Sequence, residues 1–141
     1  MSHQNPFALP KAVNAELRLV LDYWRRLRRG ENDVPFADDV SLSGVPNSKV
    51  FLIKVSQSPL RFQFAFAQDA LQASLPVGCF IDEASTSGIF SYLLTQCCAT
   101  VEAGAPTFFR LRASDPVGDF SRLILPAWSD GHISLLLGAI G

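Results

Sequence analysis

Two pairs of short apolar segments, each joined by a tight turn, constrain the fold of this 141-residue chain most strongly. The first pair is SKVFLIKVS at 48–56 and LRFQFAFA at 60–67. In the second segment Phe62, Phe64 and Phe66 alternate with other residues and are expected on one face of the strand. The second pair is FSRLILPAW at 120–128 and ISLLLGAIG at 133–141, with an Asp-Gly turn between them. Short turns join strands that pair antiparallel. The sequence therefore predicts an antiparallel sheet built from hairpins.

Two helices and a further strand complete the predicted order. Apolar residues recur every three or four positions in residues 11–29, which predicts an amphipathic helix that ends at Gly30. A second helix is expected within residues 85–104, before a strand at 106–114. Pro126 in the fourth strand suggests an edge position or a bulge. The predicted fold is α+β: a five-stranded antiparallel sheet, a helical crossover on one face and an extra N-terminal helix.

The composition is that of a folded globular chain. Hydrophobic residues make up 48% of it, charged residues make up 18%, and the net charge is −1. At this length we expect a single domain over residues 11–141, preceded by a flexible leader at 1–10. We find no signal peptide, and no segment reaches the ~20 apolar residues of a membrane span. We therefore expect a cytoplasmic protein that does not associate with membranes.

The cysteines and histidines give little sign of a metal or a cofactor. Cys79, Cys97 and Cys98 are odd in number and lack the C-x-x-C spacing of zinc sites. Haem would need an axial ligand, but His3 lies in the leader and His132 follows a turn. We expect no metal site, and no cofactor other than a small hydrophobic ligand.

A cluster of four arginines raises the question of nucleic-acid binding; its members are Arg25, Arg26, Arg28 and Arg29. Residues 11–29 hold six basic and two acidic residues, whereas residues 30–41 hold four acidic residues and no basic one. The positively charged segment is thus followed directly by an acidic segment that balances its charge. Basic residues in the last turn of a helix also complement the helix dipole. The structural explanation is therefore favoured, and a nucleic-acid interface through Arg25–Arg29 is the less favoured alternative.

Several fragments, taken in order, resemble the PAS domains, and in particular a single-domain PAS-type family of alphaproteobacteria. The fragments are LDYWRRLRRGENDVPFADDV, KVFLIKV, LRFQFAFA, AGAPTF and SRLILPAWSDGHISLLLGAIG. The resemblance implies a PAS core over about residues 48–141, with a hairpin, a helical crossover and a three-stranded meander. It also implies a sensory or regulatory module that binds a small ligand or a protein partner and has no catalytic activity. The chain departs from the family at Gln63, Ala65 and Ala67, where the family often has an arginine and a glycine.

In PAS-like folds a ligand cavity can lie between the sheet and the helical crossover. The residues expected to line such a cavity here are Phe62, Gln63, Phe64, Phe66, Leu71, Phe80, Phe90, Tyr92, Leu94 and Phe109. Gln63 and Tyr92 are the polar candidates that could orient a ligand. The alternative is a core that these side chains fill, because protein interiors are close-packed.

The N-terminal helix carries the predicted partner surface. Its apolar stripe includes Leu17, Leu21 and Trp24, and should pack on the sheet or on a second subunit of a homodimer. We therefore expect a stand-alone PAS-like regulatory module that acts by protein–protein interaction, and not an enzyme. A small enzyme or ligand carrier with an α+β pocket is the main alternative. Ser129 and His132 share a hairpin turn, but proximity in sequence does not make a catalytic triad.

Overall fold

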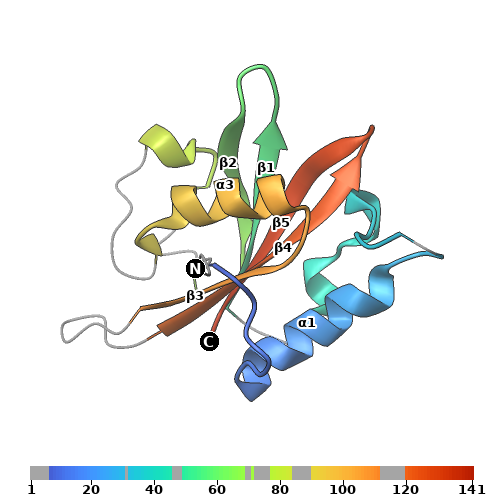
Figure 1. Ribbon diagram of the computed structural model, residues 1–141. Helices are drawn as coiled ribbons and strands as arrows, with labels where there is room; N and C mark the ends of the chain where they lie inside the picture. Colours follow the sequence, from blue (N-terminus) through green and yellow to red (C-terminus); the bar gives the residue numbers. More distant parts are fainter. Residues whose placement is uncertain are drawn as a thin grey trace, which may run out of the picture.

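The protein is described by a computed structural model over residues 7–30, 32–45, 49–68, 71, 77–83, 90–111 and 120–141. The helices and strands of the described chain (Figure 1) are α1 (Ala15–Leu27), β1 (Val50–Ser56), β2 (Arg61–Ala67), α3 (Leu93–Ala103), β3 (Thr107–Leu111), β4 (Phe120–Ser129) and β5 (His132–Ile140). Short 3-10 helices at Ala37–Asp39, Leu42–Gly44 and Ile81–Glu83 lie in the connections. The predicted start of the second helix, near residue 85, lies outside the described residues.

The five strands form one open antiparallel sheet in the order β2-β1-β5-β4-β3. β1 and β2 form a hairpin, and β3, β4 and β5 form a meander. Between them the chain passes from one edge strand, β2, to the opposite edge strand, β3, through α3. The predicted α+β fold with a five-stranded antiparallel sheet is therefore confirmed.

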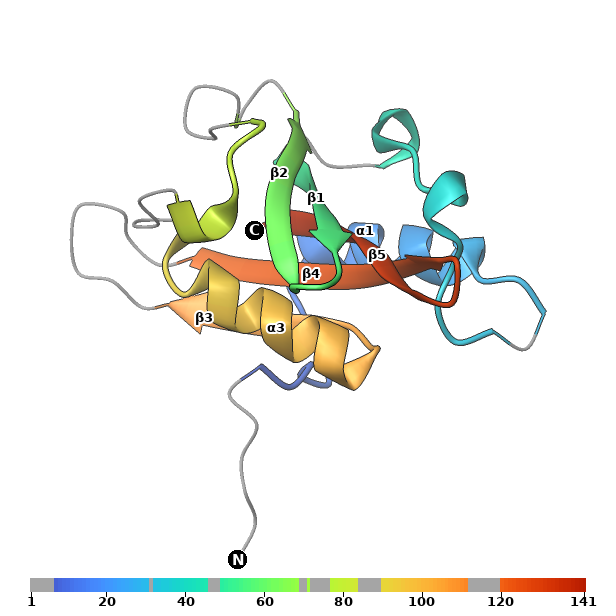
Figure 2. The same cartoon turned by 90° about the horizontal axis from the view of Figure 1, so that it is seen from above.

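The helices α1 and α3 cover opposite faces of the sheet (Figures 1 and 2). On the α3 side the buried core includes Phe51, Ile53, Phe64, Leu93, Cys97, Ile124 and Leu136. On the α1 side it is formed by Leu17, Val20, Leu21, Trp24, Val45, Val50, Leu123, Leu125, Leu137 and Ala139. Successive residues of a strand point to opposite faces, so β4 and β5 contribute to both cores. This two-sided burial explains why their sequences are apolar along most of their length.

α1 begins after Asn14, which caps it. The Oδ1 atom of Asn14 accepts a hydrogen bond from the Leu17 backbone N–H at 2.9 Å, which satisfies one of the donors that a first helical turn leaves free. The helix ends at Leu27, and Gly30 adopts a positive φ of 56° just beyond it. α1 is therefore shorter than the predicted span of 11–29, although the predicted break at Gly30 fits its backbone.

The segment before α1 is docked on the edge of the sheet from Phe7 onward. The Phe7 side chain is buried, and its ring centre lies 5.9 Å from that of Phe109. The Phe7 carbonyl oxygen accepts a hydrogen bond of 2.9 Å from the backbone N–H of Phe108, on the outer edge of β3. Leu9 packs against the core on the α1 side. The prediction of a loose leader over residues 1–10 is therefore corrected at Phe7 and Leu9, whose apolar partners lie far away in sequence.

A β-bulge in β2 changes which phenylalanines face the core. Leu52 pairs with Phe66 and the next residue, Ile53, pairs with Phe64, so Ala65 has no partner on β1. One extra residue in a strand moves the following side chains to the opposite face. Phe64 is accordingly buried, whereas Phe66 is 47% exposed. The prediction of a single alternating phenylalanine face is wrong at Phe66 for this reason.

The hairpin of β4 and β5 confirms its predicted turn. The Asp-Gly pair has positive φ at both residues, 53° and 83°, as a tight two-residue hairpin turn requires. The register shifts between Ala127 and Trp128, one residue beyond Pro126. β3 pairs with β4 only as far as Ile124, so Pro126 has no β3 partner. Pro126 therefore lies both beside a bulge and at a locally open edge, as prolines in sheets do.

The bulge predicts different outcomes for two substitutions on the same strand. Phe64→Ala should lower the free energy of unfolding by about 3–5 kcal/mol, because it empties a buried site. Phe66→Ala should change this free energy by less than about 1 kcal/mol, because its ring is already half in water. Urea denaturation of the two variants measures both values. Equal losses would contradict the bulge and restore a single phenylalanine face.

Candidate functional site

The residues predicted to line a ligand cavity fall into several groups in the structure. Those buried between α3 and the sheet are Phe62, Phe64, Leu71 and Phe90. Phe109 of β3 is partly buried and packs against this core. Three lie on the surface: Phe66 is 47% exposed, Tyr92 is 63% exposed and Leu94 is 40% exposed. Gln63 and Phe80 are half-buried and lie at the outer edge of β2.

The buried group is packed ring against ring. The Phe90 ring centre lies 5.7 Å from that of Phe51 and 5.7 Å from that of Phe64, with the rings edge-on in both pairs. Gly138 of β5 lies directly opposite Phe51, and a Cβ atom at this glycine would collide with the Phe51 ring. These side chains contact one another, as the filled-core alternative predicts.

Gln63 and Phe80 close the outer edge of β2. The side-chain amide of Gln63 donates a hydrogen bond of 2.8 Å to the carbonyl of Gly78. The guanidinium of Arg61 lies 3.6 Å from the centre of the Phe80 ring and forms an ion pair of 3.0 Å with Asp82. The segment that follows β2 is thus fastened back onto this strand, and Gln63 is used for that contact.

A polar cluster that the sequence analysis did not predict lies between α3 and the sheet. Its side chains are buried among apolar neighbours and are contributed by α3 (Gln96, Thr100), β3 (Thr107) and β4 (Arg122). Buried polar groups are normally hydrogen-bonded, because leaving one unpaired is costly. We call these four residues the Arg122 cluster.

Arg122 joins β4 to α3 through this cluster. Its Nε atom donates to Gln96 Oε1 at 2.7 Å, and a terminal nitrogen donates to the Ser91 carbonyl at 2.8 Å. Gln96 Nε2 donates to Thr107 Oγ1 at 3.1 Å and to the Arg122 carbonyl at 3.2 Å. The Thr100 and Thr107 hydroxyl oxygens lie 2.6 Å apart. The network therefore ties the beginning of α3 to β3 and β4.

The Arg122 guanidinium is a cation held in the core. Its central carbon lies 5.0 Å from the Phe109 ring centre and 5.9 Å from that of Phe120, within the range of cation–π attraction. Burial lowers the pKa of Arg122 to about 10, because removal from water disfavours the charged form. Hydrogen bonds and ring contacts must offset this cost for the side chain to stay in place. The cluster places a positive charge and a hydrogen-bond network next to the residues predicted to bind a ligand.

The sequence did contain a signal for this cluster. In FSRLILPAW, Phe120, Arg122 and Ile124 alternate onto the face that α3 covers, so an arginine occupies a core position of an apolar strand. Gln96 and Thr100 are four residues apart and therefore share one face of their helix. An inward arginine combined with inward polar residues on the covering helix predicts a buried network.

The residues predicted as a partner surface, Leu17, Leu21 and Trp24, are buried against the chain's own sheet. The indole N–H of Trp24 donates a hydrogen bond of 2.7 Å to the Pro126 carbonyl within this contact. Of the two destinations predicted for the stripe, the sheet or a second subunit, the structure shows the sheet. These side chains are therefore not free to contact a partner in the folded chain.

The arginine-rich end of α1 is partly compensated by nearby acids. Arg29 donates two hydrogen bonds of 2.7 Å to the Asp39 carboxylate, in the acidic segment that follows the helix. Arg18 and Arg25 lie 3.3 Å and 3.9 Å from the Asp22 carboxylate. Exposed pairs of this kind contribute little to stability, because water and salt screen them. They favour the structural explanation of the arginine cluster, while nucleic-acid binding stays a prediction.

The hairpin between β4 and β5 holds the remaining residues that were considered as a catalytic site. The Ser129 hydroxyl donates to the Ser134 hydroxyl at 2.7 Å, while the His132 ring nitrogen lies 3.4 Å from the Asp130 carbonyl. Ser129 is thus hydrogen-bonded to a second serine. The described residues contain no group of three or more His, Cys, Asp or Glu side chains that could hold a metal ion. Within the same part of the chain, every helix is too short or too polar to cross a membrane.

The described residues define a class of protein: an α+β chain whose open five-stranded antiparallel sheet has α1 on one face and α3 on the other. Comparisons with family models, with curated proteins and with solved structures give no match to this chain.

The Arg122 cluster predicts strong coupling between two substitutions. Gln96→Leu should lower the free energy of unfolding by about 2–3 kcal/mol, because it removes a partner of a buried cation. With Arg122→Met already present, the same substitution should cost at least about 1 kcal/mol less, because that cation is gone. A double-mutant cycle by urea denaturation measures this coupling, and pairing Arg122→Met with the exposed Lys54→Met is the additive control. Additivity between positions 96 and 122 would contradict the network.

The cysteines predict a second, chemical test of the same core. Cys97 is buried next to Gln96, and burial raises the pKa of its thiol, whereas Cys79 and Cys98 are exposed. Since the thiolate is the reactive form, Cys97 should react with a water-soluble disulfide reagent only after unfolding. Thiol counts on native and denatured protein measure this, and Cys97→Ala should lower only the denatured count. Rapid reaction of Cys97 in the native protein would show that the α3-side core is open to water.

Proposed function

We propose that this chain is a PAS-like regulatory module of the cytoplasm that binds a small hydrophobic ligand on the α3 side and acts through a protein partner. The connectivity supports this proposal: a hairpin, a helical crossover to the far edge of the sheet, and a three-stranded meander, as the resemblance implies. The core of the module is the segment from about residue 48 to residue 141. Its proposed activity is recognition, without catalysis.

The observation that carries the proposal is the link between Arg122 and the end of the crossover. Arg122 lies in the sheet, while Ser91 precedes α3 and Gln96 lies in its first turns. A ligand that displaced α3 would break these hydrogen bonds in the core, where each unsatisfied group costs about 1–3 kcal/mol. Packed cores move between discrete arrangements and do not deform continuously. The cluster would therefore give the crossover two distinct positions, which a partner could distinguish.

Tyr92 supports a hinge at the same place. It lies between Ser91 and α3 with a φ of 59°, a left-handed conformation that costs a residue other than glycine about 1–2 kcal/mol. The Phe109 ring lies 5.7 Å from the Tyr92 ring and 5.0 Å from the Arg122 guanidinium, so it contacts both the junction and the cluster. A strained junction next to the anchoring arginine is where a change in the crossover would begin.

Native mass spectrometry of the purified protein tests the proposal. The expected spectrum shows the chain with an additional small mass that is absent under denaturing conditions, and it also reports self-association. Gln96→Leu should lose the additional mass, because this substitution disturbs the α3 side. Phe66→Ala should retain it, because Phe66 faces the other side of the sheet.

Two results together would count against ligand binding by this module. The first is the bare mass of the chain at every concentration. The second is an unchanged melting temperature when small apolar molecules are added, because a ligand that binds only the folded state raises stability as its concentration exceeds its Kd. Loss of the additional mass in Phe66→Ala but not in Gln96→Leu would place the ligand on the α1 side instead.

A further inference from the structure

A cavity of about 310 Å³ lies on the α1 side of the sheet, at the edge formed by β3 and β4. It is separate from the Arg122 cluster, which occupies the opposite face. Its walls come from the segment before α1, from β3 and β4, and from the end of β5, and are formed by Ala12, Val13, Asn14, Phe108, Arg110, Phe120, Ser121 and Gly141. Its volume falls at the lower end of the range of small-molecule sites.

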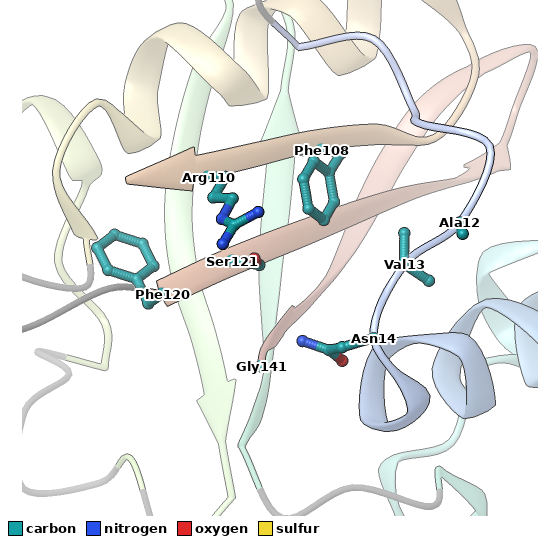
Figure 3. A pocket seen from close by; sticks show the side chains of 8 residues that line it. All are labelled: Ala12, Val13, Asn14, Phe108, Arg110, Phe120, Ser121 and Gly141. Atoms are coloured by element: carbon teal, nitrogen blue, oxygen red, sulfur yellow. The ribbon is translucent and has the colours of Figure 1, made fainter. Parts of the chain in front are cut away.

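Three side chains that line this cavity, Asn14, Arg110 and Ser121, can donate hydrogen bonds. In Figure 3 the Arg110 side chain reaches toward Ser121, and the Phe108 ring lies beside it. Among the described residues the Arg110 guanidinium has no hydrogen-bond or ion-pair partner, and the Ser121 hydroxyl has none either. Asn14 uses its Oδ1 atom to cap α1, which leaves its amide N–H groups available. The cavity therefore offers N–H and O–H groups to an acceptor.

Backbone hydrogen bonds and the docked segment before α1 hold the walls of the cavity in place. The backbones of Ser121 and Gly141 exchange two hydrogen bonds, of 2.8 Å and 2.9 Å, which fix the floor. The segment that carries Ala12 and Val13 is anchored upstream, where Phe7 binds the edge of β3. A site that is formed before its ligand arrives loses less entropy on binding.

We propose that this cavity binds a small amphipathic carboxylate: one apolar ring or short chain with a single carboxylate group. The Phe108 ring and the Val13 side chain, which lie on the α1 side, would contact the apolar part. Arg110 would bind the carboxylate through two N–H groups, a geometry that favours planar anions. The volume leaves room for a single ring with a short acidic side chain. The site does not depend on the proposed function, because it lies on the opposite face from the Arg122 cluster.

Binding of phenylacetate to the whole chain tests this site, by titration calorimetry together with NMR chemical shifts. The expected result is saturable binding, with shift changes at Ser121 and Phe108. Arg110→Gln should weaken binding at least about tenfold, since a hydrogen bond to a charged group is lost. Arg26→Gln removes an exposed arginine on α1 that is outside the cavity, and should leave the affinity unchanged. Both arginines are exposed, so both variants should fold normally, and circular dichroism checks that they do.

Three results would overturn the proposal. Equal binding of phenylacetamide would show that the carboxylate is not recognised. Equal binding of inorganic phosphate, or equal weakening by Arg26→Gln, would show a general attraction of anions to the basic surface. Absence of binding at millimolar phenylacetate would show that the cavity has no affinity for this class. In each case the ligand on the α3 side could still be detected by native mass spectrometry, so the two proposals fail separately.

Discussion

The central strands β4 and β5 are apolar toward both faces of the sheet, and the rest of the structure depends on covering both. Leu123, Leu125 and Leu137 require the cover that α1 provides, while Ile124 and Leu136 require the cover that α3 provides. Burying each such side chain stabilises the fold by about 1.5–3 kcal/mol, whereas an exposed ion pair contributes less than about 1 kcal/mol. The position of α1 is therefore decided by its apolar stripe. Its arginines form the solvated side of a helix that belongs to the core.

Arg122 is the exception to this apolar rule, and it gives the α3 side a different character from the α1 side. Apolar contacts hold α1, with the Trp24 indole hydrogen bond as an added fixed point. α3 is held by apolar contacts and by a directional network around a buried cation. Hydrogen bonds specify one position of a helix more sharply than apolar burial does, but they are expensive to break in a core. This difference is why the proposed switch is placed at α3 and not at α1.

Much of the fold follows from local patterns, because strand alternation and Asp-Gly turns depend on residues close together in sequence. The errors come from interactions between distant segments. The face of Phe66 depends on how β2 pairs with β1, and one strand's sequence does not reveal a bulge formed by the pair. Phe7 looked like part of a loose leader because its partner, Phe109, is far along the chain. The Arg122 cluster was missed because Gln96 becomes a partner only once α3 lies on β4.

Native-state hydrogen exchange can show directly whether α1 is part of the core or a detachable helix. Amides from Val20 to Trp24 are predicted to exchange only in the global opening that also exposes β4 and β5, with the same free energy and the same denaturant dependence. Exchange of these α1 amides through a separate, lower-energy opening, while β4 and β5 stay protected, would contradict the two-sided core.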